Sequence, residues 1–254
     1  MKILLKNIKM EIKVNKKRWI IAQESEKGYW KQFTTKSLLG YLEKVYKEKL
    51  NSLLKKWDGK IKINKNTKIL QIGCGPLDII NYFKKGKRYS IDPLAEFYKK
   101  RFNIDYKSTH LKEASGEQLP YSDNYFDLVI LDNVLDHTSS PEKVLSEIYR
   151  VLKKDGILHL EIQIYQKIFL VLTKIWGPIK KLFTREIFNI HHPHMFLSKD
   201  VEKMISKKFI IITKEYENVE KLKEERKKQR FTLRFLALFK ILGNINYLFI
   251  CKKK

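Results

Sequence analysis

Between residues 67 and 164, short apolar runs alternate with segments of helical periodicity. The apolar runs predict strands at 67–73, 88–92, 109–114, 126–132 and 157–164, and the periodic segments predict helices at 77–85, 94–102 and 141–153. Strands that alternate with helices are typical of a largely parallel sheet with helices on its faces. The sequence therefore predicts an α/β domain.

Segments on both sides of this region extend the domain. From Gly28 to Trp57, apolar residues recur at helical spacing, which predicts one or two amphipathic helices in an N-terminal extension over residues 1–66. We expect the main domain at 67–254, with a helix at 199–206, strands at 209–216 and 247–252, and insertions at 166–198 and 217–243 that form a helical cap.

The formal net charge of +25 lies outside the centre of the chain. Residues 67–165 hold 14 basic and 14 acidic side chains, so the whole excess belongs to the flanking segments. A strongly basic chain indicates nucleic acid, an anionic membrane or an acidic substrate as partner. Frequent use of Lys throughout the chain explains the same charge without any such partner, so charge alone identifies none.

Two observations argue against metal sites, disulfides and secretion. The only cysteines are Cys74 and Cys251, without metal-ligand spacing, and the cluster His191-His192-Pro193-His194 has no Cys or acidic run nearby to complete a ligand set. The amino terminus lacks a continuous apolar stretch, and no run of 18 uncharged apolar residues occurs. We expect a cytoplasmic protein without a bound metal.

The first strand leads directly into a glycine-containing turn. Gly73 and Gly75 allow close approach of a ligand to the backbone, and Asp92 ends the next strand 19 residues after Gly73. A carboxylate at that separation binds ribose hydroxyls in nucleotide-binding sheets. Asp78 occupies the position of the third glycine of the dinucleotide motif, so we expect a nucleoside without a bridging pyrophosphate.

Four blocks in this order make residues 67–165 resemble the class I S-adenosylmethionine-dependent methyltransferases, with a type 11-like domain. The blocks are 69–78, 89–93, 116–127 and 147–156. The resemblance implies a Rossmann-like, seven-stranded sheet that is mostly parallel with an antiparallel last strand. It also implies S-adenosylmethionine as cofactor and methyl transfer as the reaction.

The resemblance further implies which residues contact the cofactor. Gly73 and Gly75 would pack against its methionine part, and Asp132 and Asn133 would line the pocket at the same end. Asp92, which Pro93 follows, would accept hydrogen bonds from the ribose hydroxyls. The adenine would be contacted by Ser115, Gly116 and Glu117. Gln71, Leu77 and Ser115 depart from the residues usual in the family. These departures leave open a cofactor-binding scaffold without activity.

Two histidines are candidates for the acceptor side. His137 follows the fourth strand, and an imidazole that titrates near neutral pH suits deprotonation of a hydroxyl; a structural role for the same side chain is the alternative. His194 precedes the next helix, where related enzymes border the substrate cleft, and is the second candidate.

The residues favour a small acceptor over nucleic acid. Leu131-Asp132-Asn133-Val134 stands where base N-methyltransferases have Asn-Pro-Pro-Tyr or Asp-Pro-Pro-Tyr, and Lys16-Lys17-Arg18-Trp19 is too short for an RNA-binding face. We expect O-methylation of a small-molecule, saccharide or lipid-linked acceptor, with RNA binding or RNA modification as the alternative. Segments 168–177 and 231–242 mix apolar with basic residues, which predicts either a lid over the cleft or a peripheral contact with an anionic membrane.

Overall fold

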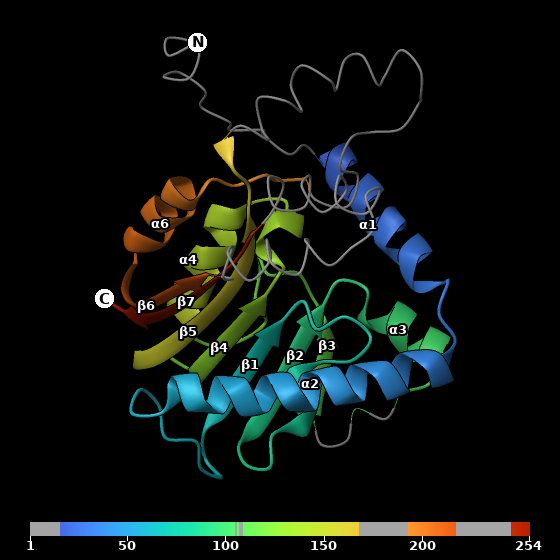
Figure 1. Ribbon diagram of the computed structural model, residues 1–254, viewed down its shortest axis with the longest axis horizontal. Helices are drawn as coiled ribbons and strands as arrows, with labels where there is room; N and C mark the ends of the chain where they lie inside the picture. Colours follow the sequence, from blue (N-terminus) through green and yellow to red (C-terminus); the bar gives the residue numbers. More distant parts are fainter. Residues whose placement is uncertain (1–15, 105, 107–108, 168–192, 217–244) are drawn as a thin grey trace, which may run out of the picture.

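One seven-stranded sheet runs through the middle of the computed structural model, with helices on both of its faces (Figure 1). The structure describes residues 16–104, 106, 109–167, 193–216 and 245–254. The described helices are α1 (Lys16–Trp30), α2 (Thr35–Trp57), α3 (Ala95–Phe102), α4 (Pro141–Val151) and α6 (Ser198–Ser206), with 3-10 helices η1 (Ile79–Tyr82) and η2 (Leu135–His137). The strands are β1 (Lys68–Ile72), β2 (Lys87–Asp92), β3 (Thr109–Glu113), β4 (Phe126–Asp132), β5 (Leu152–Ile164), β6 (Phe209–Tyr216) and β7 (Ile245–Lys253).

The strand order is β3-β2-β1-β4-β5-β7-β6. Strands β1 to β5 pair in parallel, whereas β7 runs antiparallel to both β5 and β6. This confirms the predicted mostly parallel sheet and its antiparallel last strand. The order reverses between β1 and β4, and a crevice at the carboxyl ends of such strands is where open α/β sheets bind ligands.

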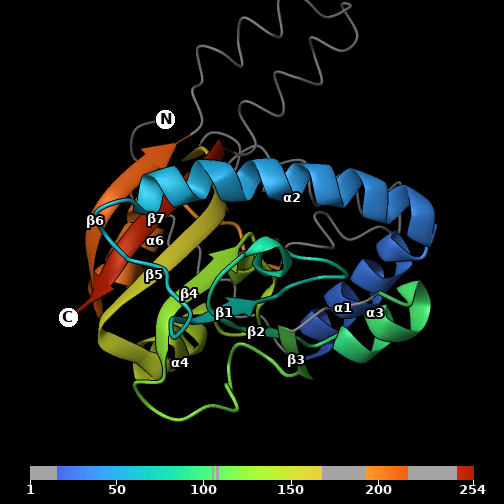
Figure 2. The same cartoon turned by 90° about the horizontal axis from the view of Figure 1, so that it is seen from below.

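Alternate residues of the central strands serve two separate cores. Ile69 of β1 packs with α2 in one core, whereas Leu70 and Ile72 pack with α4 and α6 in the other. Both sets are buried because the sheet is covered on both faces, which explains why the strands read as continuous apolar runs. Figure 2 shows α2 and α4 on opposite sides of the sheet.

The predicted helix at 77–85 is wrong, because only the short η1 forms there. The Asp78 carboxylate accepts hydrogen bonds from the Asn81 backbone N–H at 3.3 Å and from Ser90 Oγ at 2.8 Å, which fixes a tight turn at this point. The sheet face that a longer helix would cover is filled by α2, through Leu50, Leu53 and Trp57. The segments on the two sides of the boundary expected at residue 66 therefore share one hydrophobic core.

The described part of the N-terminal extension, residues 16–66, contains two helices, α1 and α2, and α1 begins well before the predicted region. The link between them is fastened to α3, since Arg101 Nη2 donates to the carbonyl oxygens of Lys31 at 3.2 Å and Phe33 at 2.9 Å. This contact holds α1 beside the carboxyl ends of the strands.

The remaining predicted elements of the described chain agree with the structure to within a few residues. Of insertion 166–198 only residues 166–167 and 193–198 are described, and insertion 217–243 lies outside the described residues, as do segments 168–177 and 231–242. Within the described part of the chain, none of the helices combines the length and the hydropathy needed to cross a membrane.

Candidate cofactor and methyl-transfer site

A pocket opens at the carboxyl ends of β2, β1 and β4, where the strand order reverses. It brings together most of the residues that the sequence predicts for the site: Gly73, Gly75, Asp92, Pro93, Gly116, Glu117, Asp132, Asn133 and His137. Ser115 and His194 are not among its lining residues.

The glycine turn after β1 forms the floor of the pocket. Gly73 and Gly75 have φ values of 68° and 59°, a region that glycine adopts without the strain of a Cβ atom. The Gly73 N–H donates to the Ile91 carbonyl at 2.8 Å. A Cβ atom on Gly73 would lie 2.4 Å from Val134 Cγ2, so the close packing of this turn against the segment after β4 requires glycine.

Asp92 is buried at the end of β2, with its carboxylate on the pocket. Its Oδ2 accepts from the Gly75 N–H at 2.9 Å, and its Oδ1 accepts from the Leu94 N–H at 2.8 Å. Burial raises the pKa of Asp92 to about 6. Each oxygen keeps a second lone pair, so the carboxylate can accept two more hydrogen bonds from a ligand.

Asp132 and Asn133 line the pocket on the β4 side. Asp132 Oδ2 contacts Lys49 Nζ at 2.6 Å, and Asp132 Oδ1 accepts from Asn133 Nδ2 at 3.3 Å. Asn133 has a φ of 51°, and its Oδ1 is buried without a hydrogen-bond partner among the described residues. A ligand that donates a hydrogen bond here would satisfy that oxygen.

Glu117 links the pocket to the start of α4. Its Oε1 accepts from the Ser139 N–H at 2.7 Å, from Ser139 Oγ at 2.8 Å and from the Ser140 N–H at 3.2 Å. The neighbouring Gly116 lies close to Ile72 and Val144, where a Cβ atom would meet their methyl groups at 3.2 and 3.3 Å. The Ser115 carbonyl accepts from the Gln118 N–H at 3.2 Å, which closes a turn beside the pocket.

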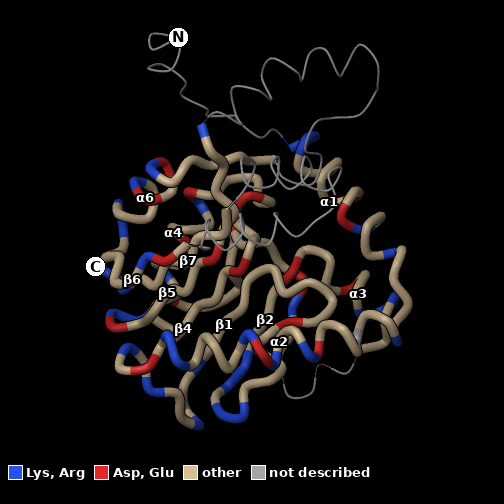
Figure 3. Tube along the Cα trace, in the orientation of Figure 1, with Lys and Arg blue, Asp and Glu red and all other residues tan. Residues whose placement is uncertain are grey.

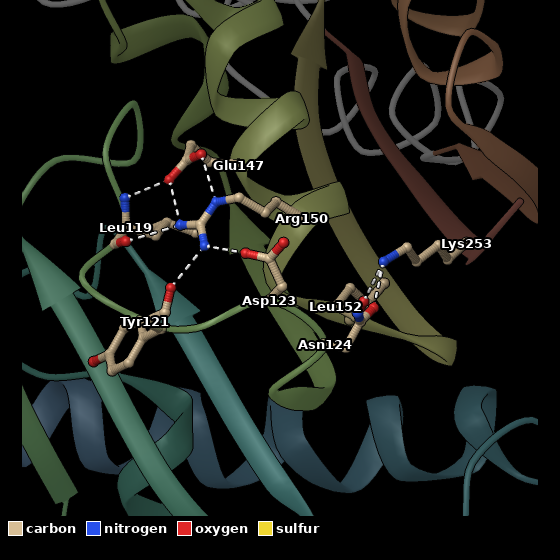
Figure 4. A network of polar contacts seen from close by, with 8 residues as sticks. All are labelled: Leu119, Tyr121, Asp123, Asn124, Glu147, Arg150, Leu152 and Lys253. Atoms are coloured by element: carbon tan, nitrogen blue, oxygen red, sulfur yellow. Dashed lines mark hydrogen bonds and ion pairs between the residues drawn. The ribbon is translucent and has the colours of Figure 1, made fainter.

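Arg150 of α4 fastens the segment that follows Glu117 (Figure 4). Its guanidinium donates to the carbonyl oxygens of Leu119 at 3.0 Å and Tyr121 at 2.8 Å, and to the carboxylates of Asp123 at 2.8 Å and Glu147 at 2.8 and 2.9 Å. One arginine thus joins two blocks that are separate in the sequence, 116–127 and 147–156.

We expect Arg150→Met to lower the free energy of unfolding by about 2–4 kcal/mol, because several charge-assisted hydrogen bonds are lost and two partly buried carbonyls lose a donor. Urea denaturation followed by circular dichroism measures this change. Lys99→Met is the control, since it removes only an exposed ion pair with Glu96 and should change stability by less than about 1 kcal/mol. Equal effects of the two variants on stability would contradict the role of Arg150 in fastening the segment after Glu117 to α4.

His137 is the histidine that faces the pocket. It ends η2, its side chain is 26% exposed, and its Nε2 lies 4.0 Å from the buried Asp136 Oδ2. His194 contacts this segment from outside the pocket lining. Its ring Nε2 lies 2.9 Å from the Thr138 carbonyl oxygen, and its backbone N–H donates to the Asp136 carbonyl at 3.1 Å. The ring also stacks on Phe196. Burial lowers the pKa of His194. The structure therefore places His194 as a support of the 136–138 segment.

The sequence analysis did not predict that residues of the N-terminal helices line one wall of the pocket. Trp19, Gln23, Glu26 and Trp30 of α1 and Tyr46 of α2 line the pocket. The indole of Trp30 donates to Glu26 Oε1 at 2.7 Å. The four α1 residues recur at intervals of three and four, which is the spacing of one helix face, and that is the signal that could have found them.

The pocket is acidic within a basic protein. Among the described residues that line it, Glu26, Asp92, Glu117 and Asp132 are acidic and none is Lys or Arg. Figure 3 shows Lys and Arg mainly along the outer parts of the trace, with Asp and Glu also near its middle. No group of three or more His, Cys, Asp or Glu side chains in the described part of the chain could hold a metal ion, and His191 and His192 lie outside that part. The pocket thus suits a ligand that carries positive charge.

The comparisons with known proteins agree with this geometry. The profile of the family described as "Methyltransferase domain" matches residues 70–160. The match shows that residues 70–160 carry a methyltransferase domain, and the mostly parallel seven-stranded sheet agrees with the class I S-adenosylmethionine-dependent family. The cofactor of that family is S-adenosylmethionine.

Relatives and solved structures are similar over different shares of the chain. An uncharacterised protein of Methanocaldococcus jannaschii is 33% identical over 123 residues, which are 48% of this chain and 51% of that protein. A ubiquinone/menaquinone biosynthesis C-methyltransferase of Psychromonas ingrahamii is 33% identical over 79 residues, 31% of this chain and 28% of that protein. This chain therefore covers about half or less of these relatives.

A solved structure shares the fold over most of the chain. Geranyl diphosphate C-methyltransferase of Streptomyces coelicolor, in complex with geranyl diphosphate and S-adenosyl-L-homocysteine, has a TM-score of 0.60 and 9% sequence identity. The similarity covers 86% of this chain and 83% of that one. At this identity the likeness concerns the fold.

Proposed function

We propose that the chain is an S-adenosylmethionine-dependent methyltransferase that methylates a hydroxyl oxygen of a small-molecule, saccharide or lipid-linked acceptor. The observation that carries the proposal is that His137 lines the same pocket as the Gly73 turn and Asp92. One cavity thus offers a nucleoside site and a group able to accept a proton.

The residues of the pocket fit this cofactor. Asp92 has lone pairs for two ribose hydroxyls at the end of β2. Across β1, Asp132 offers negative charge and Asn133 Oδ1 an unused acceptor, which suit a cationic amino-acid group. The four acidic lining residues favour a cofactor with a sulfonium and an ammonium group.

The chain's own contribution to the reaction is positioning and proton acceptance. When bound, the cofactor supplies a methyl group on a sulfonium, so that the acceptor oxygen forms a bond to the methyl carbon while the carbon–sulfur bond breaks and its electron pair stays on sulfur. His137 would accept the proton that the hydroxyl loses. The Asp136 carboxylate, 4.0 Å from His137 Nε2, stabilises the imidazolium that results. Holding donor and acceptor in line supplies much of the rate enhancement.

We expect His137→Ala to lower kcat by about 100- to 10,000-fold, the usual effect of a lost general base, with cofactor affinity changed by less than about threefold. Single-turnover transfer of labelled methyl and isothermal titration calorimetry measure the two effects. His110→Ala is the control, because His110 is exposed on β3 and stacks on Tyr89 away from the pocket. An unchanged kcat in His137→Ala would assign that side chain a structural role.

The acceptor is identified from the labelled product. Purified protein is supplied with labelled S-adenosylmethionine and with extract fractions separated into RNA, lipid, glycan and small metabolites. We expect label in one of the last three, attached to oxygen by mass spectrometry. The named reaction of the Psychromonas relative and the ligand of the Streptomyces structure support an acceptor with an apolar part, and they make a methylated carbon the alternative product. Label in RNA would overturn the acceptor class, and cofactor binding without transfer would indicate a scaffold.

A cytoplasmic protein in peripheral contact with an anionic membrane fits a lipid-linked acceptor. The support is the mixture of apolar and basic residues in segments 168–177 and 231–242. Flotation with liposomes, with and without anionic lipid, tests this contact. Flotation only with anionic lipid supports it, and no flotation with either lipid contradicts it.

A further inference from the structure

Lys49 makes a contact with the pocket that nothing in its local sequence indicates. It lies on α2, and its Nζ is 2.6 Å from Asp132 Oδ2 and 2.6 Å from Glu161 Oε2. Asp132 and Glu161 are direct partners in the register of β4 and β5, so two carboxylates stand side by side where β4 ends. One ammonium group bridges both.

We propose that Lys49 is a positioning residue of the cofactor site, which holds Asp132 ionised and oriented toward the pocket so that it can receive the cationic methionine part of the cofactor. The proposal rests on the function proposed above. It assigns a role in cofactor binding to a helix outside the segment 70–160 that matches the family.

The surroundings of Asp132 explain why it needs this cation. Burial raises the pKa of Asp132, and the neighbouring Glu161 charge acts in the same direction, while Lys49 opposes both. The other titratable groups that interact with it are Tyr46 from α2, which is neutral because burial and Asp132 raise its pKa, and His159 from β5. Lys49 is thus the cation that α2 brings to this carboxylate.

His159 contributes a hydrogen bond to Glu161. The Trp57 indole, which only donates, gives its hydrogen bond to His159 Nδ1 at 3.2 Å, so Nδ1 accepts and the ring proton is on Nε2. Nε2 then donates to Glu161 Oε1 at 3.3 Å. This contact orients Glu161, whose backbone carbonyl accepts from the Asn133 N–H at 2.9 Å.

Lys49 and Trp57 both fasten α2 to the sheet, Lys49 through Asp132 and Glu161 and Trp57 through His159. The Lys49 side chain is 25% exposed and that of Asp132 12%, so water screens the pair only in part. Removal of the ammonium would leave two adjacent carboxylates that are only 12% and 17% exposed, and the cheaper response is protonation of Asp132. A neutral Asp132 attracts an ammonium or sulfonium group far less than an ionised one.

The test measures cofactor affinity as a function of pH by isothermal titration calorimetry, which needs no acceptor. For Lys49→Met we expect the Kd for S-adenosylmethionine to rise at least about tenfold relative to the native protein near pH 6.5, and this ratio to shrink toward about pH 8.5 as Asp132 ionises again. Asp132→Asn should bind about as weakly as Lys49→Met near pH 6.5, with a ratio to the native protein that stays constant as pH rises.

Lys47→Met is the matched control, because Lys47 lies on the same helix and pairs with Glu43 in an exposed contact. It should leave the Kd within about twofold of the native value at every pH. Lys49→Arg should restore most of the affinity, since it restores the charge. If Lys49→Met fails to fold, Lys49→Gln, which keeps a hydrogen-bond donor without charge, is measured in its place with the same expectation.

Two results would overturn the proposal while the proposed function stands: a folded Lys49 variant that binds as tightly as the native protein, or one whose loss of affinity is the same at every pH. The second result would describe a helix that merely supports the fold. Failure of the native protein itself to bind S-adenosylmethionine would instead contradict the proposed function.

Discussion

Asp92→Ala should raise the Kd for S-adenosylmethionine at least about 100-fold, as judged by isothermal titration calorimetry near pH 7.5. The native carboxylate can accept two ribose hydroxyls, and each charge-assisted hydrogen bond contributes about 1.5–3 kcal/mol. Alanine keeps the backbone of β2 but offers no acceptor. S-adenosylhomocysteine should lose affinity to the same extent, because its ribose is the same.

The pH dependence of binding gives a second measure of the same carboxylate. Because the pKa of Asp92 is about 6, the native protein should lose cofactor affinity as pH falls through 6, when protonation removes the charge that strengthens these bonds. Above pH 7 this contribution to affinity is fully present. Asp92→Ala should show no step in affinity near pH 6.

Asp127→Ala is the control for Asp92→Ala. Asp127 also accepts from a backbone N–H, that of Lys68 at 2.8 Å, and from Lys153 Nζ at 2.6 Å, but it lies at the amino end of β4. It should lower stability without changing the Kd by more than about twofold. An unchanged Kd in Asp92→Ala would refute the ribose assignment.

Gly73→Ala should lower the free energy of unfolding by about 2–5 kcal/mol and abolish measurable cofactor binding. Alanine at a φ of 68° adds about 1–2 kcal/mol of backbone strain, and its Cβ would lie 2.4 and 2.7 Å from the two Cγ atoms of Val134, which adds about 1–3 kcal/mol of overpacking. The turn after β1 and the segment after β4 would have to separate. Both segments line the pocket, so the damage is expected in affinity as well as in stability.

Gly75→Ala is the variant that distinguishes backbone strain from the steric clash with Val134. Gly75 has a φ of 59°, but a Cβ atom on this residue would have Trp30 Cζ2 as its nearest neighbour, at 4.0 Å, so only the strain of about 1–2 kcal/mol applies. The double variant Gly73→Ala with Val134→Ala should recover part of the lost stability, since it removes the two Cγ atoms. Equal stabilities of Gly73→Ala and Gly75→Ala in urea would show that the contact with Val134 is not responsible.

The centre of the sheet was predictable because β1, β4 and β5 are buried on both faces and therefore appear as apolar runs. The exception is the segment after β1, where apolar residues at helical spacing predicted a helix at 77–85 and only η1 forms. The spacing is real, but Ile79 and Ile80 pack against α2 from a short turn that the Asp78 side chain fixes. The helix that covers this face of the sheet is α2, from residues 35–57. No pattern near residues 77–85 indicates that a helix from elsewhere in the chain takes the expected place.

The cofactor side of the candidate site was predictable to the extent that its residues stand at strand ends. Asp92 and Asp132 each end a strand and Gly73 directly follows one, and parallel strands bring their carboxyl ends to one edge. Lys49 and the wall from α1 were not predictable in this way. Their partners are distant in the sequence, and α1 buries only Ala22, so its sequence carries little apolar periodicity.

The position of α2 on the sheet affects how the protein folds during its synthesis. The residues that Lys49 contacts are made 83 and 112 residues later, and at about 5–20 residues/s the second delay is roughly 6–22 s. Until β4 and then β5 have been made, the apolar face of α2 lacks the strands that cover it, which makes the nascent chain a candidate for chaperone binding. The ion pairs of Lys49 with Asp132 and Glu161 can form only after Glu161 has left the ribosome, so this side of the pocket is completed late in synthesis.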